Sequence, residues 1–170
     1  MSNRNHDIQT ANQQSGTIVA VNISAAKGTR KDSVRSAEIL KDFGIRDDAH
    51  GGPWHRQVSL LALESIRKMQ TRGLAVTCGD FAENLTTRGL DLVHLPVGTR
   101  LRIGRSAIIE VTQIGKKCHL RCAVYDQTGT CIMPTEGIFA KVLSGGSVAV
   151  GDTIAVIEKD QRDRPVTPEN

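Results

Sequence analysis

Aromatic residues are scarce in this chain of 170 residues, which has one tryptophan, one tyrosine and three phenylalanines. A hydrophobic core must therefore rely on valine, isoleucine and leucine, which favours strand-rich packing. No run of about 18 apolar residues occurs, so we predict no transmembrane helix and no membrane partner. The polar start, Met1–Asp7, lacks the apolar segment of a signal peptide, and we expect a cytoplasmic protein.

Motifs of several cofactor-binding folds are also absent. The sequence has no Gly-x-Gly-x-x-Gly fingerprint of a dinucleotide-binding fold and no ferredoxin cysteine pattern. A chain of this length, with 39% hydrophobic residues, can bury one core of ordinary size but has little left for a second. The sequence therefore predicts a single domain that contains neither of these two cofactor sites.

Both ends of the chain are polar. Residues 1–15 carry Asn, Gln and Ser with almost nothing to bury, and residues 158–170 are charged and contain two prolines. Neither segment can offset the entropy cost of ordering its backbone. We expect mobile tails at 1–15 and 158–170 around one domain at residues 16–157.

Between the tails, short apolar runs alternate with glycine turns. Leu60, Leu63, Ile66 and Met69 recur at three-residue spacing, which predicts a helix over 61–72 that is capped by Gly73. The runs at 100–103 and 107–112 predict a hairpin. Further strands are predicted at residues 17–23, 83–86, 138–143 and 154–157. A mainly β fold follows, as a closed or nearly closed β-barrel with a few peripheral helices, because closure removes exposed strand edges.

A cysteine cluster carries the strongest indication of function. Cys118, His119 and Cys122 follow two lysines, and Cys131 lies nine residues further on. Thiols beside fixed cations suit sulfur or soft-metal chemistry, since positive charge stabilises a thiolate. Three sulfurs and one nitrogen also make up a zinc set, although the spacing lacks the second knuckle of a zinc ribbon. Without an export signal the thiols are expected to be free, and for Cys78 and Cys131 an inert thiol is favoured.

Positive charge gathers around the same part of the chain. Six Lys or Arg residues but only one acid lie between residues 100 and 121, a local excess of five. Such a patch favours an anionic ligand. No helix-turn-helix, zinc-finger or stacking-aromatic pattern accompanies it, which argues against nucleic acid and for a phosphorylated small molecule.

Two blocks upstream complete the pattern. His50–Leu61 begins with a Gly-Gly loop and contains Arg56, the preferred phosphate ligand because a guanidinium binds oxyanions bidentately. Gly79–Leu90 contains Glu83 and Asn84. A structural amide is the alternative reading of Asn84. In order and spacing, these blocks and the cysteine cluster resemble the MOSC domain family, which is named after the C-terminal domain of molybdenum cofactor sulfurase.

The resemblance covers about residues 16–157 and implies a standalone member of bacterial type with a β-barrel. It implies molybdenum cofactor (molybdopterin) as the small-molecule ligand and Cys118 as the catalytic residue, which ligates molybdenum or carries sulfur at the mouth of the barrel. The implied cofactor-binding residues are His50, Arg56, Gln57, Glu83, Asn84, Lys116, His119 and Arg121. Less favoured metal ligands are His119, Cys122 and Cys131. Asp47 departs from the family, which commonly has glycine there.

The implied activity has two forms. Either Cys118 transfers sulfur to a metal centre, with a separate cysteine desulfurase as partner, or molybdenum reduces N-hydroxylated compounds, with an electron-transfer partner. The chain has no room for the pyridoxal-phosphate domain of full-length sulfurases, so no pyridoxal phosphate site is expected. A non-catalytic molybdopterin carrier or chaperone and a zinc-stabilised interaction module remain as alternatives.

Overall fold

The fold is mainly β. A computed structural model describes residues 14–118, 121 and 123–158. The strands are β1 (Ser15–Ile23), β2 (Asp32–Val34), β3 (Ser36–Leu40), β4 (Gly44–Ile45), β5 (Val58–Ala62), β6 (Leu85–Arg88), β7 (Arg100–Ile103), β8 (Ala107–Ile114), β9 (Ile138–Ser144), β10 (Gly146–Ala149) and β11 (Thr153–Ile157). The helices are α1 (Leu63–Thr71), α2 (Ala123–Thr128) and α3 (Met133–Glu136).

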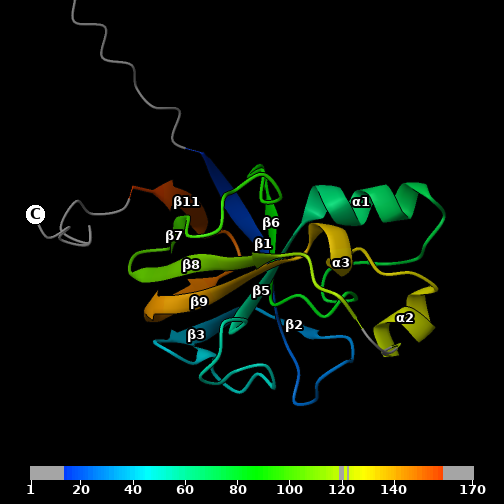
Figure 1. Ribbon diagram of the computed structural model, residues 1–170, viewed down its shortest axis with the longest axis horizontal. Helices are drawn as coiled ribbons and strands as arrows, with labels where there is room; N and C mark the ends of the chain where they lie inside the picture. Colours follow the sequence, from blue (N-terminus) through cyan, green and yellow to red (C-terminus); the bar gives the residue numbers. More distant parts are fainter. Residues whose placement is uncertain (1–13, 119–120, 122, 159–170) are drawn as a thin grey trace, which may run out of the picture.

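Seven of these strands close into a barrel, which confirms the predicted fold class (Figure 1). Around the barrel the order is β1-β6-β5-β9-β8-β7-β11, and β11 returns to pair with β1. Strands β5 and β6 are parallel, whereas the other neighbours are antiparallel. Strand β2 extends the sheet beside β1, and β10, β3 and β4 form a small second sheet. Closure pairs the strands that an open sheet would leave as edges.

Two apolar cores lie on opposite faces of the barrel wall. Along β5, Val58 and Leu60 belong to the core inside the barrel, whereas Leu61 belongs to a second core outside it, with Ile66 and Met69 of α1. Successive side chains of a strand point to opposite faces, so β5 contributes to both cores. Since both faces are covered, every residue of β5 is buried.

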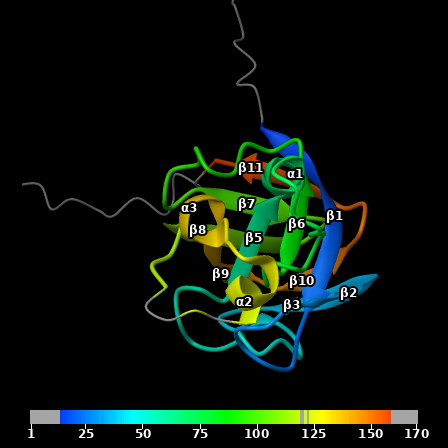
Figure 2. The same ribbon diagram turned by 90° about the vertical axis from the view of Figure 1, so that its right-hand side faces the viewer.

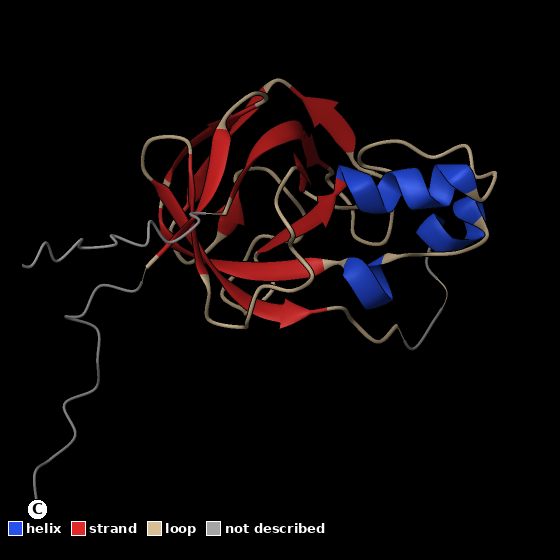
Figure 3. Cartoon of the chain, turned by 90° about the horizontal axis from the view of Figure 1, so that it is seen from above, coloured by secondary structure: helices blue, strands red, loops and turns tan. Residues whose placement is uncertain are grey.

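The three helices gather at one end of the barrel. They lie on the right in Figure 1, in front of the barrel in Figure 2, and again at one end in Figure 3. The second core joins them to the wall, because it includes Val124 of α2, Met133 of α3 and Phe139 of β9. No helix in the described part of the chain is long and apolar enough to cross a membrane.

Helix α1 is shorter than the predicted helix over 61–72. Leu61 and Ala62 instead extend β5, where they pair with Thr86 and Thr87 of β6. The three-residue apolar spacing therefore begins in a strand and continues into a helix, and periodicity alone does not separate the two. At the other end, Gly73 has a φ of +90° just past the helix, which suits the predicted glycine stop.

The other predicted elements are found with small shifts. Strands β7 and β8 form the expected antiparallel hairpin, and β1, β9 and β11 cover the predicted strands. The strand predicted at 83–86 is displaced to β6. The predicted tails lie outside the described residues, apart from residues 14, 15 and 158, and Ser15 already begins β1.

Candidate functional site

A cavity of about 1010 Å³ lies between the barrel wall and the segments that carry α2 and α3. Ser59 of β5 and Phe139 of β9 line its wall side, and these two residues are register partners. Both lie at outward-facing positions of their strands, next to inward-facing Val58 and Ala140. Apolar side chains fill the barrel, and the cavity lies outside its wall.

Positive charge surrounds the cavity without neutralising acids. No Asp or Glu lines it in the described part of the chain, and none of its Lys or Arg residues has an ion-pair partner there. An anionic ligand would therefore meet uncompensated charge. The cations are Lys27, Arg56, Lys116, Lys117 and Arg121.

Aromatic faces, rather than carboxylates, hold several of these cations. The guanidinium carbon of Arg56 lies 4.7 Å from the Trp54 ring centroid and 5.7 Å from that of Phe139. The ammonium of Lys116 lies 6.0 Å from the Phe139 centroid. A ring face attracts a cation through its quadrupole and leaves the net charge uncancelled. The Nε of Arg56 is buried and has no hydrogen-bond partner among the described residues.

The scarce aromatic residues are concentrated at this site. Four of the five in the sequence line the cavity, namely Trp54, Phe81, Tyr125 and Phe139. Tyr125 of α2 also carries a cation, since the guanidinium carbon of Arg121 lies 4.8 Å from its ring centroid. Apolar and aromatic walls with a few placed polar groups are typical of small-molecule sites, and ring faces favour a flat ligand.

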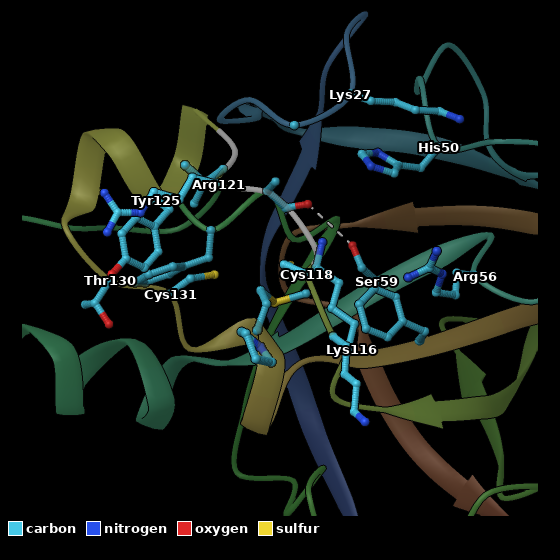
Figure 4. Close-up of a pocket in the computed structure, with 18 of the residues that line it drawn as sticks. Lys27, His50, Arg56, Ser59, Lys116, Cys118, Arg121, Tyr125, Thr130 and Cys131 are labelled. Atoms are coloured by element: carbon cyan, nitrogen blue, oxygen red, sulfur yellow. Dashed lines mark hydrogen bonds between the residues drawn. The ribbon is translucent and has the colours of Figure 1, made fainter.

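Cys118 and Cys131 line the same cavity. Cys118 is a free, exposed thiol, and Cys131 is half-buried. Figure 4 places Cys118 between a group on the barrel side, which includes Arg56 and Ser59, and a group near α2. The predicted ligands His119 and Cys122 lie outside the described residues. Within the described ranges, no group of three or more His, Cys, Asp or Glu side chains is placed to hold a metal ion.

The loop that carries Cys118 depends on Gly115. This glycine has a φ of +68°, and a Cβ there would lie 2.2 Å from the carbonyl oxygen of Pro134 in α3. Its N–H donates to the carbonyl oxygen of Gly137 at 2.6 Å. Only glycine allows this approach, so the chain leaves β8 in direct contact with α3.

Cys78, by contrast, lies away from the cavity. It is half-buried against the outer core, and burial raises the pKa of its thiol. A thiol in such surroundings is a poor nucleophile, which agrees with the prediction that it is inert.

Three predicted cofactor contacts lie behind the cavity wall, not on it. Gln57 accepts a hydrogen bond from the Val142 N–H at 2.8 Å and so extends the β5–β9 ladder. Asn84 accepts from the N–H and the hydroxyl of Ser59, at 3.0 and 3.1 Å, and is fully buried. Asn84 therefore holds Ser59, which lines the cavity, and does not line the cavity itself. This is the structural role that the sequence analysis gave as the alternative for this amide.

Glu83, the third of these residues, is fully buried below the site. Its Oε1 accepts from the Gly79 N–H at 2.6 Å and from the Thr86 hydroxyl at 2.8 Å, while Oε2 has no partner among the described residues. Burial raises the pKa of Glu83 from its ordinary value of 4.5 to about 7. The carboxyl group is thus a buried acid whose charged form is disfavoured mainly by the loss of hydration.

This burial predicts a pH-dependent stability. Between pH 4.5 and about 7 the folded state keeps the Glu83 proton and the unfolded state loses it, so stability falls as the pH rises. The loss should reach about 3 kcal/mol across this window. Denaturant unfolding of the wild type and of Glu83→Gln, measured from pH 4.5 to 8, should show a flatter profile for the variant. Glu64→Gln, at an exposed carboxylate, is the control and should keep the wild-type slope; equal slopes for Glu83→Gln and the wild type would contradict the prediction.

His50 lies on the loop between β4 and β5 and lines the cavity. Its carbonyl oxygen accepts from the indole N–H of Trp54 at 2.8 Å, so this loop also positions the ring beside Arg56. Earlier in the loop, Asp47 has a φ of +64°. Aspartate tolerates this left-handed conformation better than most residues, which explains how it replaces the glycine of the family.

The sequence is matched by a model of the MOSC domain over residues 46–155. The chain belongs to the MOSC domain family. This range covers more than half of the chain and includes Arg56, Cys118 and Cys131. The resemblance drawn from the three sequence blocks is confirmed at the level of the family.

Solved structures show the same fold. The YuaD protein from Bacillus subtilis superposes with a TM-score of 0.71 and 18% identity, over 85% of this chain and 96% of that one. YiiM from Geobacillus stearothermophilus gives 0.63 and 19%, over 84% and 75%. YiiM from Escherichia coli gives 0.58 and 18%, over 87% and 70%. No curated protein matches the chain. At such identities the likeness concerns the fold alone.

Proposed function

We propose that this MOSC domain binds molybdenum cofactor in the cavity and that Cys118 takes part in chemistry at the metal. One observation carries the proposal: a single cavity combines four of the five aromatic residues, an exposed free thiol, and five cations that form no ion pair with any described residue. These groups match the parts of molybdopterin, which has a flat ring system, a phosphate and a soft metal site.

The residues fit the cofactor part by part. The partly exposed ring of Trp54 offers an aromatic contact to the pterin beside the Arg56 guanidinium. Arg56 and Lys116 offer charge to the phosphate, and the buried Nε of Arg56 lacks a protein partner in the described part of the chain. The Cys118 thiolate is a suitable ligand for a soft metal. When bound, the cofactor would supply a molybdenum centre that exchanges oxygen or sulfur.

Two reactions are compatible with this site. In sulfur transfer, the Cys118 thiolate attacks the outer sulfur of a persulfide on a separate cysteine desulfurase, releases the desulfurase thiol and holds the sulfur as its own persulfide. Two electrons from an external thiol would then release this sulfur at the sulfide level for the metal centre and restore the Cys118 thiol. In reduction, an N-hydroxylated compound takes up two protons from solvent and two electrons from an electron-transfer partner, so that its N–OH becomes N–H and the oxygen leaves as water. Both reactions require an exposed Cys118 next to an open cavity, and both suit the cytoplasm, where thiols stay reduced.

The cofactor content of the purified protein tests the proposal. Protein from a host that makes molybdenum cofactor should contain molybdenum, by elemental analysis, and pterin, by fluorescence of its oxidised form, in about equal amounts. Protein from a host unable to make the cofactor is the control and should contain neither. Zinc without pterin, with loss of the fold on chelation, would favour the interaction module instead. Bound pterin, together with full activity of a variant that lacks the Cys118 thiol, would favour the non-catalytic molybdopterin carrier.

A further inference from the structure

A buried ion pair lies directly behind His50. The Nζ of Lys31 is 2.5 Å from Oδ1 of Asp48, and both side chains are completely inaccessible to solvent. Lys31 precedes β2, and Asp48 follows β4, so the pair joins two loops that meet beside the cavity. An ion pair this deeply buried is a costly way to stabilise a fold, which raises the question of what it positions.

The ammonium of Lys31 has three acceptors around it. Besides Asp48, these are Nδ1 of His50 at 3.0 Å and the hydroxyl oxygen of Ser24 at 3.3 Å. An ammonium has three N–H donors and no acceptor, so Nδ1 of His50 must accept. The proton of the neutral imidazole then resides on Nε2.

The competing arrangement has poorer geometry. An Nδ1–H of His50 would have to donate to Oδ2 of Asp48, which lies 3.6 Å away, beyond hydrogen-bond distance. That oxygen already accepts from the backbone N–H of His50 at 3.1 Å, and Oδ1 accepts from the Ser24 N–H at 3.0 Å.

The edge of the imidazole that faces away from Lys31 is left to line the cavity. Only 24% of the His50 side chain is exposed. Its backbone is fixed on both sides, by the N–H bond to Asp48 and by the indole of Trp54 at the carbonyl oxygen. The ring itself is held by its burial and by the hydrogen bond from Lys31 to Nδ1, which keep this nitrogen turned away from solvent.

We propose that the buried Lys31–Asp48 pair is a positioning device that fixes His50 as a neutral Nε2–H donor toward an anionic group in the cavity. The inference rests on the proposed function only in taking the ligand to be an anion. Lys31 and Asp48 act through His50, so they are positioning residues. Through them the cavity gains, beside its cations, one hydrogen-bond donor with a fixed direction. This bond requires neither a further charge nor a protonated histidine.

NMR of protein with 15N-labelled histidine tests this positioning device without any cofactor. The His50 signals are assigned as those that disappear in the His50→Gln variant. In the wild type near neutral pH, Nδ1 of His50 should show the shift of an unprotonated ring nitrogen and Nε2 that of a protonated one. Inorganic phosphate should then move Nε2 and leave Nδ1 nearly unchanged. In Lys31→Met, Nδ1 should become protonated, because Asp48 is then its charged neighbour.

His55 is the internal control, because its ring forms a hydrogen bond with Gln113 at 2.9 Å. Its nitrogen shifts should be the same in the wild type and in every variant of Lys31 or Asp48. If Lys31→Met does not fold, Lys31→Met with Asp48→Asn removes both charges, and His50 should then show a mixture of tautomers. A protonated Nδ1 in the wild type would overturn the positioning device. If His50 shows the expected tautomer but phosphate does not shift Nε2, then His50 is not a hydrogen-bond donor to an anion. The proposed function is tested separately, by the molybdenum and pterin content of the protein.

Discussion

Replacing Cys118 with serine is expected to lower sulfur transfer or N-reduction by at least about 10³-fold while the protein stays folded. Serine keeps the size and polarity of the side chain, but its oxygen neither stores sulfane sulfur nor ligates a soft metal well. Cys118 is exposed, so the substitution leaves no cavity in the core. Activity would be measured with a cysteine desulfurase, or with an electron donor and an N-hydroxylated substrate, beside thermal unfolding of the same protein.

Two other cysteines serve as matched controls. Cys78→Ser should leave activity almost unchanged and lower stability slightly, because this thiol packs against the outer core away from the cavity. Cys131→Ser should give an intermediate activity, since Cys131 lines the cavity. Full activity of Cys118→Ser with a physiological partner would refute the catalytic role and leave the cofactor carrier as the better reading.

The barrel was predictable because its strands are encoded locally. The hairpin of β7 and β8 follows from two apolar runs around a glycine turn, and these runs pair antiparallel as predicted. Strand β5 was harder to predict, since both of its faces are buried and its apolar run continues into α1. The pattern therefore has no period-2 signal at Leu61, and the boundary depends on pairing with β6, which is remote in sequence.

Part of the site was also predictable, because its residues belong to recognisable blocks. His50, Arg56, Lys116, Cys118 and Arg121 all line the cavity, although they come from two distant segments. Their roles toward a cofactor stay predictions. What the blocks do not reveal is which side of the wall each residue faces, since Glu83 and Asn84 are buried behind Ser59.

Other features of the site carried no sequence signal. Lys31 lies 17 residues before Asp48, outside every block, and a lone lysine before a short strand is ordinarily exposed. The aromatic residues did leave a clue, because five rings in 170 residues make each one conspicuous. Their convergence on one cavity depends on the register of β5 and β9 and on the placement of α2, which are tertiary features.

Arg56→Gln is expected to weaken binding of the anionic pterin by about 10- to 100-fold, the scale of one lost charge-assisted contact. Arg56 lies within cation–π distance of Trp54 and Phe139, and its buried Nε has no partner in the described part of the chain. A ligand oxyanion would satisfy this group, and the flat guanidinium can offer two parallel N–H bonds. Affinity would be measured by fluorescence titration at several salt concentrations.

Two variants separate charge from geometry in this experiment. Arg56→Lys keeps the charge but not the planar fork, so it should recover only part of the affinity. Arg105→Gln removes the same charge from the β7–β8 turn, away from the cavity, and should leave affinity within about twofold at a salt level where the Debye length is about 8 Å. If Arg56→Gln and Arg105→Gln weaken binding equally, net charge rather than a specific contact attracts the ligand. Arg56 would then have only a structural role, in its contacts with the Trp54 and Phe139 rings.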